Sequence, residues 1–248
     1  MSAEDFISIC MLVHGEEGTG KSWLGQSTPA PRLVLDAEGG SRVPWRWDGT
    51  KGVRQRKIKW NPSKEAPPEP GDWDICHVQV HTYEDVSNAY AWLNAGSHPF
   101  KSVVLDSLTE IQKKCKDSIS GTDTPTERDW GLLLIRMEHL VRAFRDLVTH
   151  PQNPLQAVVI LALTMEKSGR RKAAVQGQLG VSLPGYVDVE GYLYVQSLEN
   201  GTSERRLLIS PVDGFAAKDR THVLTEKYGA TITNPDVEQM LAVLNEEY

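Results

Sequence analysis

Short apolar runs recur along the chain, and segments with helical spacing lie between them. The runs are five to seven residues long and rich in Val, Ile and Leu, the composition of buried strands; they are 7–13, 32–36, 75–80, 102–106 and 157–163. Helical spacing occurs in 83–94 and 132–148, and the second segment has an apolar stripe of Leu134, Met137, Leu140, Val141 and Phe144. This alternation predicts an α/β fold with a mostly parallel central sheet and helices on both faces.

The later part of the chain departs from simple alternation. Two runs, 192–196 and 206–210, flank the turn residues Glu199-Asn200-Gly201, which predict an antiparallel hairpin. A final helix is expected at about 235–245, with Asn234 as its N-cap. The segment 41–74 is rich in Pro, Trp and basic residues and is predicted to be an insertion with at most a short hairpin. At this length we expect one domain over residues 1–248.

The first apolar run leads directly into a phosphate-binding pattern, G-x-x-x-x-G-K-[ST]. The pattern is filled by Gly15-Glu16-Glu17-Gly18-Thr19-Gly20-Lys21-Ser22, and residues 22–26 can open a helix after it. Backbone N–H groups of residues 15–20 are expected to surround the phosphates of ATP, with Lys21 reaching the β and γ phosphates and Ser22 holding Mg²⁺. A Gly-rich turn without a ligand is the alternative.

Two acids follow other predicted strands and complete this hypothesis. Asp106 ends the run 102–106, and the carboxyl edge of a parallel sheet is where ligands bind, so we expect Asp106 to bind Mg²⁺ through water. Glu38 follows the run 32–36 and is the candidate general base for water. The alternatives are a helix N-cap for Asp106 and a solvated loop acid for Glu38.

Composition limits the remaining function classes. The net charge of −6 argues against indiscriminate polyanion binding, so any nucleic-acid affinity must come from local basic patches. Three widely spaced cysteines indicate a reducing compartment and no disulfide framework, and the seven histidines show no metal-ligand spacing. Without a signal-peptide pattern or a run of about 20 apolar residues, we expect a cytoplasmic protein with no membrane partner.

The motifs Leu35-Asp36-Ala37-Glu38 and Val103-Val104-Leu105-Asp106-Ser107 resemble the matching segments of the RecA-type recombinase core. The resemblance runs from the first strand to about residue 220. The short length and the segment 215–221 look more like phage-encoded single-strand annealing ATPases of this group, which would place the protein in a host cytoplasm. The resemblance implies that Glu38 is the catalytic base, that Asp106 belongs to the metal site, and that copies of the chain assemble into a ring or filament. It also implies that Lys218 and Arg220 reach the nucleotide of a neighbouring subunit; the alternative is that they are surface charges paired with Asp213 or Asp219.

Recombinase-like cores bind DNA through loops at the carboxyl edge of the sheet, and the segment 166–172 is the stronger candidate here. Its cations are Lys167, Arg170, Arg171 and Lys172, which would engage phosphates without reading sequence. Thr164, at the expected strand tip, is a candidate γ-phosphate sensor. A basic surface loop unconnected with DNA is the alternative. The segment 117–130 has a weaker signal, and Trp45, Trp47 and Trp60 in the insertion suit base stacking or a partner contact.

Together these features predict a RecA-like, Mg²⁺-dependent ATPase that acts on single-stranded DNA in phage recombination or annealing, with a single-strand binding protein as a further candidate partner. Three alternatives stay open. One is a hexameric helicase-like motor on the same core. Another is a small-molecule phosphotransferase with residues 170–172 as a lid. The last is a nucleotide-dependent scaffold with negligible turnover.

Overall fold

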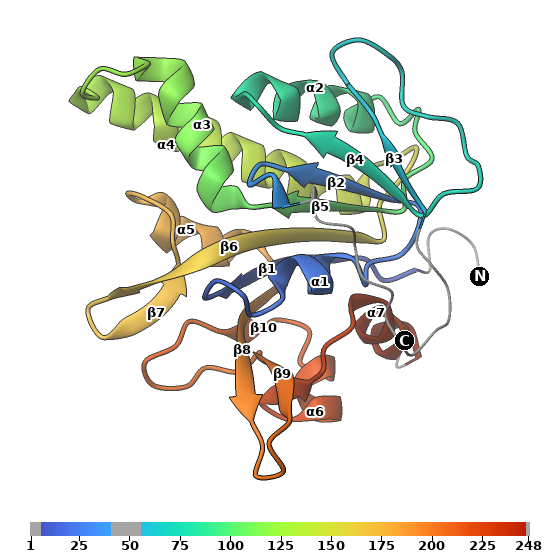
Figure 1. The fold of residues 1–248 in the computed structure, drawn as a ribbon, viewed down its shortest axis with the longest axis vertical. Coiled ribbons are helices and arrows are strands. Elements are labelled where there is room, and N and C mark those ends of the chain that lie inside the picture. The colour runs from blue at the N-terminus through green and yellow to red at the C-terminus, as the bar shows by residue number, and fades with distance from the viewer. Residues whose placement is uncertain (1–5, 41–55, 247–248) are drawn as a thin grey trace.

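The computed structural model describes residues 6–40 and 56–246 (Figure 1). In chain order the elements are β1 Ile9–Gly15, α1 Lys21–Gly25, β2 Arg32–Asp36, β3 Lys57–Lys59, β4 Ile75–Gln79, α2 Tyr83–Asn94, β5 Ser102–Asp106, α3 Leu108–Ser120, α4 Glu127–Asp146, β6 Ala157–Lys167, β7 Arg170–Ala173, α5 Leu179–Tyr186, β8 Val189–Ser197, β9 Ser203–Leu208, β10 Lys218–Asp219, α6 Val223–Tyr228, β11 Thr231–Thr233 and α7 Val237–Glu246.

The strands form one sheet in the order β11-β9-β8-β1-β6-β5-β2-β4-β3, with β10 paired to β8 and β7 paired to β6. From β8 to β3 all neighbours on this path are parallel, and β9 and β11 add antiparallel strands at one end. This confirms the predicted α/β class, with its mostly parallel sheet and late hairpin. The strand β6 lies between β1 and β5, although it comes last of the three in sequence.

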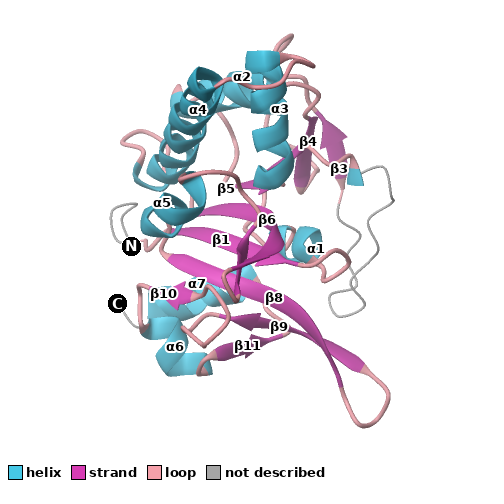
Figure 2. Cartoon of the chain, turned by 90° about the vertical axis from the view of Figure 1, so that its left-hand side faces the viewer, coloured by secondary structure: helices cyan, strands magenta, loops and turns pink. Residues whose placement is uncertain are grey.

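Helices cover both faces of the sheet, as Figure 2 shows. On one face α2, α3, α4 and α5 pack over a core that includes Leu35, Leu105 and Ile160. On the other face α1, α6 and α7 pack over a second core, in which α1 comes close to β5. Gly25 of α1 makes this approach possible, because a Cβ there would lie 2.8 Å from Cγ1 of Val104. Both faces of the central strands are therefore buried, which explains their continuous apolar runs.

Several predicted boundaries match the structure, and others need correction. The strands 32–36 and 102–106 and the helix 83–94 have the expected bounds. The helix expected at 132 begins at Glu127 instead, because Thr126 and Asp129 form a capping box. Leu133 of this helix is fully buried, whereas Leu134 is only partly so.

The predicted cap of the last helix was also wrong. Asp236, not Asn234, accepts a hydrogen bond from the Gln239 N–H in its first turn (3.0 Å). Asn234 has a φ of 47° and instead bonds to β9. Among the described residues, no helix is long and apolar enough to cross a bilayer.

The described part of the insertion belongs to the sheet and to the hydrophobic core. Its strand β3 pairs with β4 in parallel and extends the sheet by one edge strand, so the described part holds a single strand and not the short hairpin that the sequence allowed. Trp60 is buried against Phe100, with ring centres 5.8 Å apart, and its indole N–H donates to the Glu65 carbonyl. Trp60 is therefore not available for base stacking, and Trp45 and Trp47 lie outside the described residues.

Candidate nucleotide-binding site

The sheet topology brings the predicted site residues to one edge. In the register of the parallel strands, Gly15 of β1 pairs with Leu163 of β6. Asp106 of β5 pairs with Leu161 of the same strand and with Asp36 of β2. The carboxyl ends of β1, β5 and β2 therefore lie within about two residues of a common level, and the segments that follow them converge.

The predicted phosphate-binding loop, Gly15 to Ser22, turns between β1 and α1. Gly18 and Gly20 have φ values of 75° and 95°, a region that other residues rarely adopt. The ammonium group of Lys21 donates to the carbonyl oxygens of Gly15 (3.0 Å) and Glu16 (2.8 Å), so the side chain folds back along its own loop. Burial lowers the pKa of Lys21, while the carboxylates of Glu38, Asp106, Glu17 and Glu16 act in the opposite direction.

Ser22 and Asp106 meet, as the sequence predicted. The hydroxyl of Ser22 donates to a carboxylate oxygen of Asp106 over 2.6 Å. Both groups offer hard oxygen atoms, so they would suit a Mg²⁺ ion, with Ser22 binding it and Asp106 reaching it through water. Ser107, not Asp106, is the N-cap of α3 and accepts from the Glu110 N–H. The alternative of an N-cap role for Asp106 is therefore excluded.

The environment of Asp106 is strongly acidic. Burial, followed by the carboxylates of Glu38 and Asp36, raises the pKa of Asp106 to about 6, although the Ser22 hydrogen bond and Lys21 act against this. A cation bound beside Asp106 would offset the cost of burying this carboxylate and its repulsion by Glu38 and Asp36, although among the described residues no group of three or more acidic, His or Cys side chains lies close enough to hold a metal ion without other ligands.

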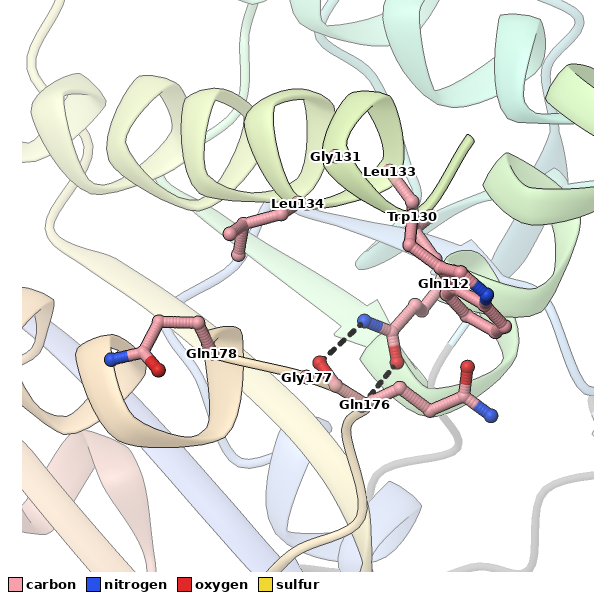
Figure 3. Close-up of a pocket in the computed structure, with 8 residues that line it drawn as sticks. All are labelled: Gln112, Trp130, Gly131, Leu133, Leu134, Gln176, Gly177 and Gln178. Atoms are coloured by element: carbon pink, nitrogen blue, oxygen red, sulfur yellow. Dashed lines mark hydrogen bonds between the residues drawn. The ribbon is translucent and has the colours of Figure 1, made fainter. Parts of the chain in front are cut away.

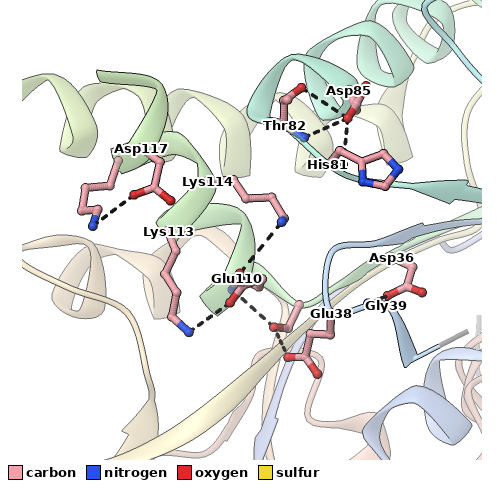
Figure 4. A network of polar contacts seen from close by, with 12 residues as sticks. Asp36, Glu38, Gly39, His81, Thr82, Asp85, Glu110, Lys113, Lys114 and Asp117 are labelled. Atoms are coloured by element: carbon pink, nitrogen blue, oxygen red, sulfur yellow. Dashed lines mark hydrogen bonds and ion pairs between the residues drawn. The ribbon is translucent and has the colours of Figure 1, made fainter. Parts of the chain in front are cut away.

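Glu38 lies beside this pair and is exposed. One of its carboxylate oxygens accepts a hydrogen bond from the Ser107 hydroxyl over 2.5 Å. Figure 4 shows how this contact continues: the same hydroxyl accepts from the Glu110 backbone, and the Glu110 side chain pairs with Lys113. The first turn of α3 therefore orients Glu38, while its exposure leaves the carboxylate accessible to water.

Thr164 contacts His14, one of the seven histidines that show no metal-ligand spacing in the sequence. Nε2 of His14 donates to the Ala216 carbonyl (2.8 Å), so Nδ1 of the neutral ring accepts from the Thr164 hydroxyl (2.9 Å). Burial lowers the pKa of His14 to about 4, which keeps the ring neutral near pH 7. The position of His14, directly before Gly15, was the only signal in the sequence for this role.

The basic segment 166–172 is a hairpin, which corrects the prediction of a flexible loop. Strand β6 continues past Thr164 to Lys167 and pairs with β7 across Ser168 and Gly169. Both turn residues have positive φ values, 54° and 72°, which suits a two-residue hairpin turn.

The four cations of this hairpin differ in accessibility. Lys167 and Arg170 are exposed, whereas Arg171 and Lys172 are half-buried. The guanidinium of Arg171 lies over the Phe215 ring (5.5 Å) and donates to the Tyr192 hydroxyl (3.2 Å). Arg171 therefore attaches the hairpin to the segment that contains Ala216. Ala216 is also the hydrogen-bond partner of His14.

Lys218 and Arg220 lie away from the phosphate-binding loop of their own chain. Arg220 donates to the carboxylate of Asp188 (3.4 Å) and to the Gly185 carbonyl (2.8 Å). Asp188 bonds to Cys10, five residues before Gly15 and thus about 16 Å along β1. Lys218 of β10 pairs with Glu190 of β8. Neither Asp213 nor Asp219 is the ion-pair partner of Arg220 in the part of the chain that the structure describes.

A cavity of about 490 Å³ lies beside α4 and the loop before α5 (Figure 3). It is lined by Gln112, Trp130, Gly131, Leu133, Leu134, Gln176, Gly177 and Gln178. Gln112 bonds to the backbone of Gln176 in both directions, which joins α3 to the loop before α5 at this cavity. None of the lining residues belongs to the phosphate-binding loop, so this cavity is separate from the candidate nucleotide site.

Comparison with known proteins adds a family. Residues 7–221 match a family described as an AAA domain. No curated protein matches the sequence. Similar solved structures include an ATPase from the type III secretion system of pathogenic bacteria, with 12% identity and a TM-score of 0.44 over 75% of this chain and 52% of that one. They also include the flagellar accessory protein FlaH from Methanocaldococcus jannaschii, with 8% identity and a TM-score of 0.41 over 91% and 84%. This chain spans about half the length of the secretion ATPase.

Proposed function

This chain belongs to the AAA domain family and is a P-loop ATPase of that family. On that premise, we propose that it couples the hydrolysis of Mg²⁺-ATP to its action on single-stranded DNA. The contact between Ser22 and Asp106 carries the proposal, because it joins the phosphate-binding loop to the end of β5. Lys21 and Glu38 lie at the same edge of the sheet, so a phosphate, a metal ion and a base have adjacent positions.

Each residue of this edge has a role in binding the nucleotide. The backbone N–H groups of residues 15–20 surround the phosphates, and Lys21 exchanges its loop carbonyls for the β and γ phosphates. Ser22 and Asp106 would hold the Mg²⁺ ion, whose charge stabilises the developing phosphate charge when it is bound.

Glu38 is the proposed general base. Its carboxylate accepts a proton from the attacking water, and the Ser107 hydroxyl holds it in place during the transfer. Thr164 is the proposed γ-phosphate sensor. It connects through His14 to the segment that holds the hairpin, so a change at the phosphate can move Lys167 and Arg170.

The DNA partner is proposed from charge and position. Exposed Lys167 and Arg170 on the β6–β7 hairpin supply cations at the same sheet edge, in a chain that is acidic overall. We assign the protein to phage recombination or annealing in the host cytoplasm, acting as an oligomer in which Lys218 and Arg220 approach the neighbouring nucleotide. A single-strand binding protein is the further proposed partner.

ATP hydrolysis measured without DNA, with single-stranded DNA and with duplex DNA tests this function. We expect the single strand to raise the rate more than the duplex, and Lys21→Ala to abolish activity under all three conditions. Activity that persists in Lys21→Ala refutes the assignment of the phosphate site. A rate indifferent to DNA refutes the DNA partner but not the ATPase.

A further inference from the structure

Arg205 of β9 lies directly over the phosphate-binding loop, although it is 183 residues beyond Ser22 in the sequence. A Cβ placed on Gly20 would lie 2.3 Å from Nε of Arg205 and 3.2 Å from its Cζ. The space that a side chain at residue 20 would need is therefore filled by this guanidinium group. Arg205 also lies over the ring of Trp23, with Cζ 5.7 Å from the ring centre.

The backbone of Arg205 is held in place from the other side. The side-chain oxygen of Asn234 accepts from the Arg205 N–H (3.2 Å), and the Asn234 N–H donates to the Arg205 carbonyl (2.7 Å). Asn234 adopts its left-handed φ of 47° at this position. Together with the stacking on Trp23, this pair of bonds orients Arg205 before any ligand arrives.

The charge of Arg205 is available for a ligand. Its side chain is exposed, and among the described residues it has no acidic partner, whereas the neighbouring Arg206 pairs with Glu204. The loop below is crowded with acids, since Lys21 is surrounded by Glu16, Glu17, Glu38 and Asp106. A polyphosphate entering this acidic edge needs cations in addition to Lys21, and a guanidinium offers the donor geometry that phosphate oxygens accept.

Resting on the nucleotide site proposed above, we propose that Arg205 binds the phosphate chain of the nucleotide held by its own subunit. It approaches from the side of Gly20 and Trp23, away from Asp106 and Glu38. The late hairpin of β8 and β9 therefore has a function beyond enlarging the sheet, because it delivers this cation to the phosphate-binding loop. Arg205 is distinct from Arg220, which lies at the other end of β1 and was predicted to act between subunits.

The test measures the affinity of the full chain for ATP and for inorganic tripolyphosphate by calorimetry, in Mg²⁺ at constant ionic strength. We expect Arg205→Ala to weaken both ligands by the same factor, about 10- to 100-fold, because charge-assisted hydrogen bonds to phosphate are lost. Arg205→Lys should recover part of both affinities. Arg206→Ala is the matched control, since it removes the same charge from the next position on β9, and it should bind both ligands like the native chain.

The outcomes separate this inference from the function on which it rests. Native affinity in Arg205→Ala overturns the role of Arg205 and leaves the nucleotide site intact. Loss of ATP affinity with unchanged tripolyphosphate affinity also overturns it, because Arg205 would then contact the base and not the phosphates. Failure of the native chain to bind either ligand overturns the nucleotide site itself.

Discussion

Replacing Asp106 with Asn should stabilise the nucleotide-free protein while it weakens Mg²⁺-ATP binding. The carboxylate has an ordinary pKa of 3.8, and its burial near Glu38 and Asp36 raises this pKa to about 6. Since each pKa unit is worth about 1.4 kcal/mol, ionising Asp106 costs the folded state about 3 kcal/mol at pH 8. Asn carries no charge and can still accept the Ser22 hydrogen bond, so the variant avoids this cost.

The sign of the pH dependence follows from the direction of the shift. The pKa of Asp106 is higher in the folded state than in the unfolded state. Asp106 therefore does not destabilise the folded state below about pH 3.8, where it is protonated in both states, and this stability is lost as the pH rises through about 6. The advantage of Asp106→Asn should therefore be about 3 kcal/mol at pH 8 and about half of that at pH 5.

Urea unfolding followed by circular dichroism, in EDTA and without nucleotide, measures this difference at both pH values. Asp117→Asn is the control, because Asp117 is an exposed acid paired with Lys116 and should change stability by less than about 0.5 kcal/mol. The proposed cost of ionising buried Asp106 is wrong if the variant Asp106→Asn is no more stable than the native chain at pH 8. It is also wrong if the gain in unfolding free energy is the same at pH 5 as at pH 8.

Three further predictions concern the chemistry and its partners. Glu38→Gln should slow single-turnover phosphate release by about 100-fold or more with unchanged ATP affinity, and a comparable loss of affinity would instead give Glu38 a binding role. Arg170→Ala should weaken binding to single-stranded DNA and reduce the salt slope of that binding by about one. Arg171→Ala should mainly lower the melting temperature of the protein, because Arg171 packs on Phe215. Equal losses of DNA affinity in the two variants would contradict these separate roles of Arg170 and Arg171. Mixing Arg220→Ala subunits with Glu38→Gln subunits should restore part of the ATPase rate if Arg220 acts between subunits, and no recovery would remove that role.

Local patterns in the sequence predicted much of the candidate site. The loop from Gly15 to Ser22 is a contiguous stretch whose glycines meet a backbone requirement, so it could be read without knowing the fold. Asp106 and Glu38 were predicted as site residues because each follows a short apolar run, and parallel strands end at a common edge. The fold class alone predicts that the ends of these strands lie close together, and the contact between Ser22 and Asp106 agrees with this prediction.

Other predictions failed where a residue's partner is distant in the chain. Trp60 resembled a base-stacking residue among cations, but Phe100, 40 residues later, buries it. Asn234 resembled a helix cap, but it bonds to Arg205 on β9. The segment 166–172 failed for a local reason instead: it resembled a loop, but Ser168 and Gly169 both adopt positive φ values and form a two-residue turn that pairs β6 with β7.

By itself, the sequence determined the phosphate-binding loop, the strand-end acids and the α/β class, because each depends on spacing within a few residues. The tertiary structure alone decided that β6 lies between β1 and β5, that His14 connects Thr164 to Ala216, and that Arg205 covers Gly20. The physical reason is that strand order and the packing of the late hairpin are settled by burial of both sheet faces together, a sum over the whole core that no short segment encodes.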